Sequence, residues 1–110
     1  MLSFTQINLH KAVQATNVLG LGLQGKSNRI ALLTEPYAHG GKITGMPGGT
    51  ALVYAEQKPN QPPPRAGILA SRDVRVTAME KWCSRDCAVA LARIGGKQAV
   101  IVSLYLDICL

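Results

Sequence analysis

The chain has 110 residues, of which 47% are hydrophobic and 16% are charged. This length fits one small domain, and the apolar content excludes general intrinsic disorder. Twelve Lys and Arg residues against six Asp and Glu residues give a formal net charge of +6, and each half of the sequence carries half of it. A basic balance of this kind is compatible with a polyanionic partner such as nucleic acid, but it does not identify one.

The first half of the sequence predicts one helix among short strands. In the predicted helix, residues 11–23, apolar side chains recur at helical spacing and a group of glycines closes the segment. The apolar run that stops at Pro36 is expected to be a buried strand. Between residues 38 and 50, five glycines and one proline predict a loop. The strands are expected at 4–8, 29–35 and 51–55.

The second half is predicted to consist of strands and loops. The proline-dense stretch 58–65 is expected to be a surface loop, because proline has no backbone N–H to donate in a helix or an inner strand. Gly95 and Gly96 separate two apolar runs, which is typical of a two-residue hairpin turn. The strands are expected at 66–70, 74–79, 87–94 and 97–106.

The three cysteines, Cys83, Cys87 and Cys109, are expected to be free thiols in a reducing compartment. The four-residue spacing of the first two is unusual for structural zinc, so two thiols in a strand are the simpler interpretation. The start of the chain lacks the pattern of a secretion signal, and the apolar stretch 99–110 is too short to span a membrane. We therefore expect an intracellular protein, nuclear or cytoplasmic, without a membrane partner.

The segment from Gly20 to Ser27 (GLGLQGKS) matches the P-loop pattern G-x-x-x-x-G-K-[ST]. A phosphate-binding loop of this kind needs a strand before it and a helix after it, so that the helix N-terminus faces the phosphates. Here a predicted helix comes first and a predicted strand follows. A glycine-rich helix end is therefore the preferred interpretation, and a P-loop nucleotide binder is the least favoured alternative.

Asn8, Glu35 and Tyr105 each lie at the end of a predicted strand, where binding and catalytic groups often gather. One carboxylate can hold a divalent cation, and an amide and a phenol can add hydrogen bonds to a phosphate. Each residue also has a structural interpretation: Asn8 as a helix cap, Glu35 as a surface residue before a turn, and Tyr105 as a core residue. From the residues alone, both sets of interpretations stay open.

Six short segments occur in a characteristic order: QINL (6–9), LTEPY (33–37), GGKITG (40–45), RAGIL (65–69), WCSRD (82–86) and VSLYL (102–106). Together they resemble the endonuclease domain of non-LTR retrotransposons, which precedes the reverse transcriptase and belongs to the endonuclease/exonuclease/phosphatase family alongside the AP endonucleases. The resemblance covers nearly the whole chain. It implies an α/β fold, part of a four-layer α/β sandwich that is mostly β with one main N-terminal helix.

The resemblance also implies a reaction and a set of site residues. The family hydrolyses phosphodiester bonds with Mg²⁺ and a water that a histidine activates. By resemblance, Asn8 lies near the metal and the scissile phosphate, Glu35 binds the metal, and Tyr105 contacts the phosphate. The implied protein is a Mg²⁺-dependent DNA endonuclease that nicks target DNA for retrotransposition, with the ion acting as a Lewis acid on the developing oxyanion.

The chain departs from the family pattern in ways that bear on activity. Thr34 stands where the family more often has glutamine, and neither His10 nor His39 lies in the segment of the catalytic base. The later Gly-Asp-x-Asn and Ser-Asp-His segments do not follow Tyr105. Residues 1–110 are therefore expected to be the N-terminal portion of a truncated domain, inactive alone, with the C-terminal half and a reverse transcriptase as missing partners. Without a second sheet, we expect an exposed apolar face.

A second interpretation is a degenerate retroelement remnant that retains only weak, salt-dependent binding to nucleic acid. The candidate DNA contacts are Arg65, Arg72, Arg75 and Arg85. A solvated surface charge is the simpler interpretation of each arginine, so no specific DNA contact is assigned. By motif, neither Asp86 nor Asp107 matches the aspartates of the family.

Overall fold

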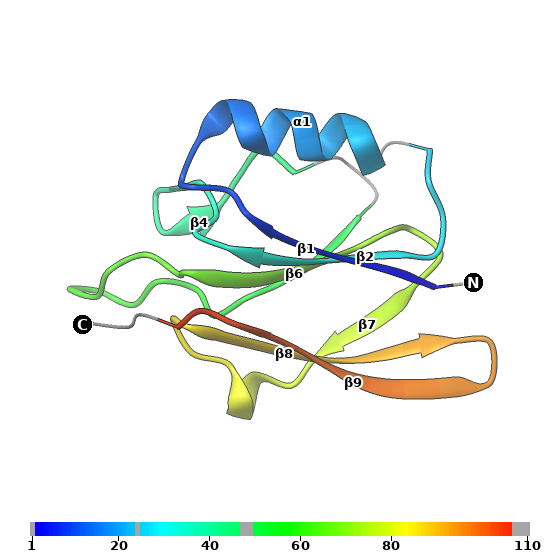
Figure 1. Cartoon of the computed structure of the whole chain (residues 1–110). Coiled ribbons are helices and arrows are strands. Elements are labelled where there is room, and N and C mark those ends of the chain that lie inside the picture. Colours follow the sequence, from blue (N-terminus) through cyan, green and yellow to red (C-terminus); the bar gives the residue numbers. More distant parts are fainter. Residues whose placement is uncertain (1, 24, 47–49, 107–110) are drawn as a thin grey trace.

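One helix and two stacked β-sheets form three layers (Figure 1). The computed structural model describes residues 2–23, 25–46 and 50–106. In chain order, the elements are β1 (Ser3–Asn8), α1 (Val13–Leu23), β2 (Arg29–Thr34), β3 (Ala38–His39), β4 (Lys42–Ile43), β5 (Ala51–Val53), β6 (Ala66–Ala70), β7 (Arg75–Ala78), the short 3-10 helix η1 (Glu80–Trp82), β8 (Cys87–Ile94) and β9 (Lys97–Leu104). This arrangement confirms the predicted α/β class, mostly β with one main helix.

The first sheet has the strand order β1-β2-β6-β5, and the second has the order β7-β8-β9. The strands β1 and β2 are parallel, and their register places Asn8 opposite Thr34. All other paired strands are antiparallel. Because parallel neighbours need a crossover connection, α1 lies between them in the chain. The carboxyl ends of β1 and β2 therefore meet at the same edge of the first sheet.

The helix α1 covers the outer face of the first sheet (Figure 1). On one side of it, Ala15, Leu19 and Leu23 follow each other at four-residue spacing, which places them on one face. They pack with Leu33 and Leu69, which are fully buried in β2 and β6. No helix among the described residues is long and apolar enough to cross a membrane.

The glycine-rich segment that matches the P-loop pattern closes α1. Gly20 and Gly22 lie within the helix, and the Lys26 backbone N–H donates to the Leu23 carbonyl at 3.1 Å. The strand β2 then begins at Arg29. The order is helix then strand, as expected, so the N-terminus of α1 points away from this segment and cannot face a phosphate bound there.

A second apolar layer lies between the two sheets. Ile30 and Ile68 from the first sheet pack with Ala90 and Ile101 from the second, and all four are at most 7% exposed. The expectation that the second sheet is missing was therefore wrong. The chain leaves the first sheet at the end of β6 and turns through residues 71–73 into the second sheet, so a single stretch supplies strands to both.

The expected exposed apolar surface is present, but on a different face. Along β9, buried Ile101 and Ser103 alternate with Val100, Val102 and Leu104, which are 47–58% exposed on the outer face of the second sheet. The one α-helix among the described residues, α1, lies on the first sheet and not on this face (Figure 1). Three of the four layers of the expected sandwich are thus present.

The stretch 38–50, predicted as a loop, contains the two-stranded hairpin of β3 and β4. Gly40 and Gly41 join these strands with φ of 62° and 83°, a left-handed conformation that glycine adopts without a steric penalty. Each strand has only two residues, which is too short for a hydrophobic period to show. The predicted hairpin turn at Gly95 and Gly96 is confirmed between β8 and β9.

Candidate functional site

The three residues named from the sequence lie at strand ends on the same side of the fold. Asn8 ends β1, Glu35 follows β2 directly, and Tyr105 follows β9 directly. Ser103 lies two residues before Tyr105, and Leu33 lies two residues before Glu35. The buried Ser103 hydroxyl donates a hydrogen bond of 3.0 Å to the Leu33 carbonyl. This contact ties β9 to β2 across the sandwich and so fixes the ends of both strands relative to each other.

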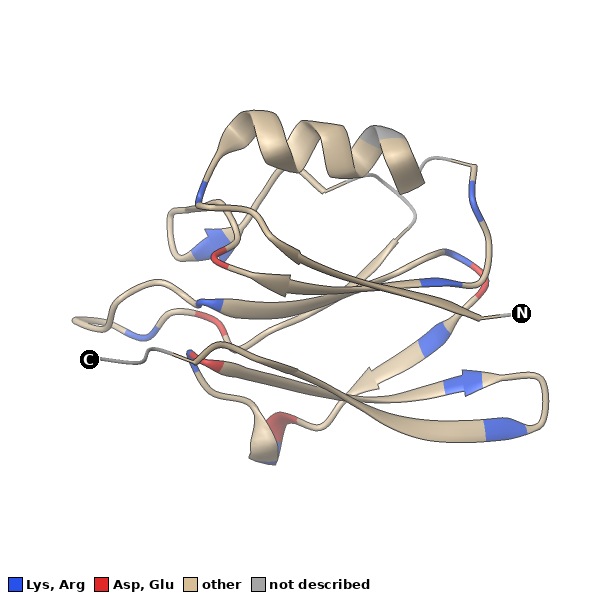
Figure 2. Ribbon diagram, in the orientation of Figure 1, with Lys and Arg blue, Asp and Glu red and all other residues tan. Residues whose placement is uncertain are grey.

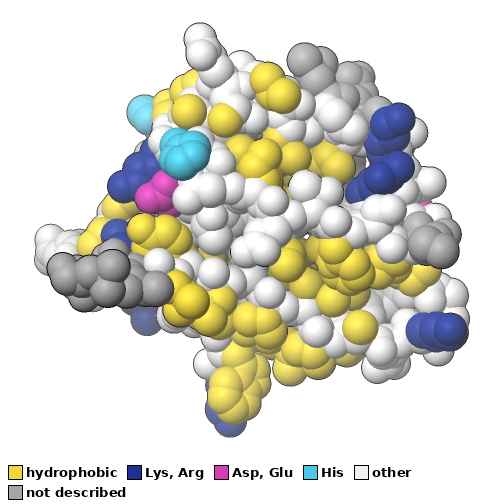
Figure 3. Space-filling model, viewed as in Figure 1, with side chains coloured by type: hydrophobic (Ala, Val, Ile, Leu, Met, Phe, Trp, Pro, Cys, Tyr) yellow, Lys and Arg dark blue, Asp and Glu magenta, His cyan; other side chains and the backbone are white. Residues whose placement is uncertain are grey.

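Glu35 and Tyr105 are in direct contact. The Tyr105 hydroxyl donates to Glu35 Oε1 at 3.3 Å. On the other side of the carboxylate, His10 Nδ1 lies 3.6 Å from Glu35 Oε2. The Glu35 side chain is 24% exposed and that of His10 is 77% exposed, so a partly buried carboxylate lies between a phenol and a solvent-facing imidazole. The space-filling view shows His and acidic side chains together at this end, on the left (Figure 3).

Asn8 lies one strand away, with its side chain turned to its own loop. Its Oδ1 accepts the His10 backbone N–H at 2.8 Å, the hydrogen bond of an Asx turn. The helix α1 begins only at Val13, so the interpretation of Asn8 as a helix cap was wrong. The register pairs Asn8 with Thr34, the residue before Glu35, so the exposed Asn8 lies beside the end of β2 that leads into Glu35.

Three non-glycine residues at the site adopt left-handed backbone conformations. Their φ values are +49° for Glu35, +51° for His10 and +57° for Lys11. Such conformations cost roughly 1–2 kcal/mol each for residues with a Cβ atom, and they cluster at functional sites. Backbone hydrogen bonds hold them in place: the Lys11 N–H donates to the Glu35 carbonyl at 2.8 Å, and the Glu35 N–H donates to the Arg65 carbonyl at 2.9 Å.

A partly buried arginine contacts Tyr105. The Arg65 side chain, 16% exposed, donates two hydrogen bonds of 2.6 Å to the Asp86 carboxylate. Its guanidinium also lies over the Tyr105 ring, 4.4 Å from the centroid. The Tyr105 backbone N–H donates to the Asp86 carbonyl at 2.9 Å. Arg65 and Asp86 therefore fix both the ring and the backbone of Tyr105.

The electrostatics of this pair follow from its geometry. The hydrogen bond from Arg65 holds the pKa of the Asp86 carboxyl below its ordinary value. Arg85 adds a weaker attraction, with Nη1 3.9 Å from Asp86 Oδ1, and its Nε donates to the Pro63 carbonyl at 2.9 Å. The interpretation of Arg65 and Arg85 as solvated surface charges was therefore wrong, because both are held by protein acceptors.

The sequence analysis considered His10, Arg65 and Asp86 but assigned none of them to this cluster. His10 was set aside because it lies in the wrong segment for a catalytic base, yet the turn after β1 brings it back to Glu35. Arg65 and Asp86 both lie in segments that carry the family resemblance. That coincidence was the one available signal, since no spacing rule joins two residues 21 positions apart in loops.

The two described cysteines flank the turn that carries Asp86. Cys83 follows η1, where its Sγ donates to the Val89 carbonyl at 3.5 Å and accepts the Val89 N–H at 3.4 Å. Cys87 begins β8, and burial raises the pKa of its thiol. The expectation that both thiols lie in a strand was wrong, since only Cys87 does. Cys109 and Asp107 lie outside the described residues.

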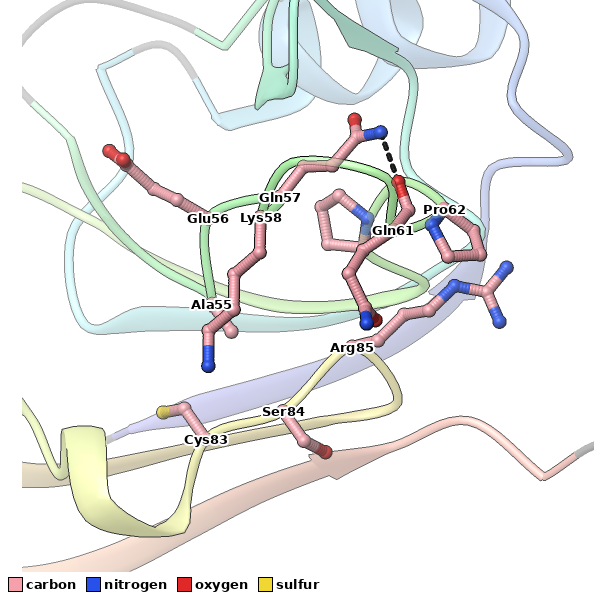
Figure 4. Close-up of a pocket in the computed structure, with 10 residues that line it drawn as sticks. Ala55, Glu56, Gln57, Lys58, Gln61, Pro62, Cys83, Ser84 and Arg85 are labelled. Atoms are coloured by element: carbon pink, nitrogen blue, oxygen red, sulfur yellow. Dashed lines mark hydrogen bonds between the residues drawn. The ribbon is translucent and has the colours of Figure 1, made fainter.

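A cavity of about 200 Å³ lies between the proline-rich loop and the turn that carries Cys83 and Arg85 (Figure 4). The Gln57 side-chain amide reaches across its rim and donates to the Gln61 carbonyl. None of the three predicted site residues lines this cavity. The candidate site is therefore separate from this cavity.

A comparison with solved structures identifies the fold. No protein-family model and no curated protein matches the sequence. The structure is similar to the endonuclease domain of TRAS1, a telomere-specific non-LTR retrotransposon, with a TM-score of 0.66 and 19% identity over 94% of this chain. The chain shares the fold of that endonuclease domain. It spans 44% of the length of the TRAS1 chain, so the similarity concerns less than half of that domain.

Proposed function

We propose that this chain is the N-terminal portion of a Mg²⁺-dependent DNA endonuclease of the endonuclease/exonuclease/phosphatase type, which nicks target DNA for retrotransposition. The observation that carries the proposal is the contact between the Tyr105 hydroxyl and the Glu35 carboxylate, two groups 70 positions apart in the sequence. The similarity to the TRAS1 endonuclease domain supports the same class of reaction by analogy of fold. A DNA substrate of this kind implies an intracellular location, nuclear or cytoplasmic.

The side chains at the site fit a magnesium ion that keeps several water ligands. Mg²⁺ prefers oxygen ligands and is usually held by one or two carboxylates together with substrate phosphates. Among the described residues, no group of three His, Cys, Asp or Glu side chains could enclose a metal, whereas Glu35 offers one partly buried carboxylate. When bound there, the ion would polarise a phosphoryl oxygen and stabilise negative charge in the transition state.

The other residues orient the substrate. The Tyr105 hydroxyl has a single proton to donate, and it can donate that proton to a phosphate oxygen in place of the Glu35 carboxylate. The amide of Asn8 can add a further hydrogen bond from the neighbouring strand. Arg65 and Asp86 keep Tyr105 aimed at this point, since they hold its ring and its backbone N–H.

We further propose that the chain works with a C-terminal half and is inactive without it, in a polyprotein that also carries a reverse transcriptase. Two observations support the missing half. The chain corresponds to 44% of the TRAS1 chain, and Val100, Val102 and Leu104 are exposed on β9, the edge strand of the second sheet. Further strands and helices would bury these three apolar side chains, which lie beyond the Arg93–Gln98 pair along β9. They would also supply the catalytic base, which no histidine of the family pattern provides here.

Terbium luminescence tests the metal site without requiring activity. Tb³⁺ is a hard cation that binds carboxylate oxygens and emits when a nearby tyrosine is excited. We expect tyrosine-sensitised emission that excess Mg²⁺ suppresses and that Glu35→Gln abolishes. The matched control, Glu56→Gln, removes an exposed carboxylate outside the site and should leave the emission intact. Equal emission from both variants would overturn the metal-binding role of Glu35.

A plasmid-nicking assay tests the reaction. With Mg²⁺, the chain alone should nick supercoiled DNA no faster than an EDTA control does. Nicking that depends on both Mg²⁺ and Glu35 would confirm the site and contradict the proposed inactivity. The alternative function, a remnant that only binds nucleic acid, predicts neither nicking nor a terbium signal that depends on Glu35.

A further inference from the structure

The positive charge of the chain is concentrated at one end of the fold. We call this region, opposite to Glu35, the basic end. It holds six exposed or partly exposed residues: Lys26, Arg29, Arg72, Arg75, Arg93 and Lys97. Asp73 is the one acidic residue described there, so this end carries a formal charge of +5, against +6 for the whole chain. Figure 2 shows these blue segments on the right, at the ends of both sheets.

Two of these arginines face each other on neighbouring strands. The register of β7 and β8 places Arg75 directly opposite Arg93, and the register of β8 and β9 places Gln98 opposite Arg93 on its other side. All three side chains are exposed. Like charges directly opposite each other in a sheet destabilise the pairing. Within the described part of the chain, neither arginine has an ion-pair partner that would offset this repulsion.

Asp73, the one acidic residue described at the basic end, forms hydrogen bonds with nearby neutral groups. Asp73 accepts the Asn28 backbone N–H at 2.9 and 3.0 Å and the Ser71 hydroxyl at 2.7 Å. These hydrogen bonds hold the turn between the two sheets to the start of β2, where the Arg29 N–H also donates to Ser71 Oγ at 2.9 Å. Asp73 therefore fixes the local backbone, while the arginine side chains around it remain available to a ligand.

We propose that the basic end binds the phosphate backbone of double-stranded DNA, at a place separate from Glu35. Adjacent strands lie about 4.8 Å apart, so the guanidinium groups of Arg75 and Arg93 can engage neighbouring phosphates together. A bound phosphate removes the repulsion that the free protein carries. The eight-residue strand β8 connects the two ends, which puts them roughly 25 Å apart at 3.3 Å per residue. The basic end thus retains the chain on DNA through a contact that does not depend on the nicking site.

Fluorescence anisotropy with a labelled DNA duplex in EDTA tests this proposal. The double variant Arg75→Gln/Arg93→Gln should bind about tenfold more weakly at about 100 mM salt, and its salt slope should fall by close to 2, because each lost phosphate contact lowers the slope by roughly 0.9. The matched control, Lys42→Gln/Lys58→Gln, removes the same charge from exposed positions outside the basic end. It should change the affinity less than twofold. Equal losses in the two variants would overturn the proposal, as would no loss in the arginine variant.

Thermal unfolding distinguishes a lost contact from a damaged fold. Removing one of two facing arginines relieves repulsion, so Arg93→Gln should bind DNA more weakly while its midpoint stays equal or rises. A binding loss that accompanies a lower midpoint would overturn the assignment of Arg93 as a DNA contact. A second variant, Arg75→Lys/Arg93→Lys, retains the charge and should keep the affinity within about threefold. Arg75→Gln/Arg93→Gln should keep the tyrosine-sensitised terbium emission, so the failure of this proposal and the failure of the proposed nuclease site give different results.

Discussion

The two ends of the fold differ in whether their charged side chains have partners. Around Glu35, the fold provides partners: Arg65 is held by Asp86 through two hydrogen bonds, and Tyr105 and His10 flank the carboxylate. At the basic end, six Lys and Arg residues have no ion-pair partner among the described residues, and Arg75 faces Arg93. Figure 3 shows the same contrast on one surface, with mixed charges on the left and mainly Lys and Arg on the right.

Charged residues can have two different roles here: fixing the positions of neighbouring groups, or attracting a charged ligand. Partly buried charges with fixed partners hold a geometry, because moving either group leaves its partner unsatisfied. Exposed like charges hold no geometry, but they create a field that a polyanion can neutralise. Under the two proposals above, the end that carries Glu35 orients reacting groups, and the basic end retains a charged ligand. Both ends reduce the stability of the free fold, the first through left-handed backbone and the second through repulsion.

The largest expected difference between the ends comes from replacing an arginine. Arg65→Met removes the partner of a partly buried carboxylate and the group over the Tyr105 ring, so we expect a loss of roughly 2 kcal/mol in the free energy of unfolding. Arg75→Met, at the basic end, should change it by less than about 0.5 kcal/mol or stabilise the fold. Urea denaturation of both variants measures the difference. Equal losses in the free energy of unfolding would show that the partners of Arg65 stabilise the fold no more than the surroundings of Arg75 do.

A smaller effect is expected from removing the hydroxyl that ties β9 to β2. Ser103→Ala deletes a buried hydrogen bond to the Leu33 carbonyl and should cost about 1 kcal/mol. Because this bond sets where Tyr105 meets Glu35, it should also weaken the tyrosine-sensitised terbium emission. Ser71→Ala removes a buried hydroxyl at the basic end and should cost a similar amount without changing the emission. An unchanged signal in Ser103→Ala would contradict the positioning role of this contact.

A stabilising change is expected at Glu35 itself. Its φ of +49° is unfavourable for any residue with a Cβ atom, so Glu35→Gly should raise the free energy of unfolding by roughly 0.5 kcal/mol after the extra entropy of glycine in the unfolded chain is counted. Glu35→Ala also lacks the carboxylate but keeps the Cβ atom, and it should not be more stable than the native protein. If both variants are equally stable, the left-handed conformation is not a source of strain.

Local patterns predicted most of the elements and little of their assembly. The hairpin of β8 and β9 was predicted because Gly95 and Gly96 determine the turn locally. The second sheet was not expected, since the choice of β7 to leave the first sheet depends on packing between distant strands. Similarly, the residues alone left Asn8, Glu35 and Tyr105 open to structural interpretations, and it was the family resemblance that singled them out.

The order of residues in the sequence does not predict where charge lies in the fold. Each half of the sequence carries half of the net charge, which suggests an even spread. In the fold, antiparallel strands return distant segments to the same end, so Lys26, Arg75 and Lys97 all lie at the basic end. The contact of Tyr105 with Glu35 arises in the same way, through packing of β9 on β2. Neither feature has a local signature in the sequence.

The smallest expected effect is on the stability of the fold at low pH, to which the Asp86 and Asp73 carboxylates contribute through different hydrogen bonds. The pKa of Asp86 is lowered mainly by the Arg65 hydrogen bond, whereas the pKa of Asp73 is lowered mainly by the Ser71 hydroxyl and then by the Asn28 backbone N–H. A carboxyl with a lower pKa in the folded state stabilises the fold above its unfolded pKa, and this contribution is lost as pH falls through the folded value. Both contributions should therefore be fully present at pH 6 and be lost progressively as pH falls below about 4.

Added salt should distinguish the contributions of the two carboxylates to stability. Both carboxylates are exposed enough for solvent to screen them, so the changes in the unfolding midpoint should be small. Between pH 6 and pH 2, Asp86→Asn and Asp73→Asn should each flatten the acid-induced fall of the midpoint. Added salt should weaken the Asp86 contribution more, because it is an attraction between charges, while neutral donors supply that of Asp73. Equal salt sensitivity in the two variants would show that the field of the surrounding arginines, and not the Ser71 and Asn28 hydrogen bonds, stabilises the Asp73 carboxylate.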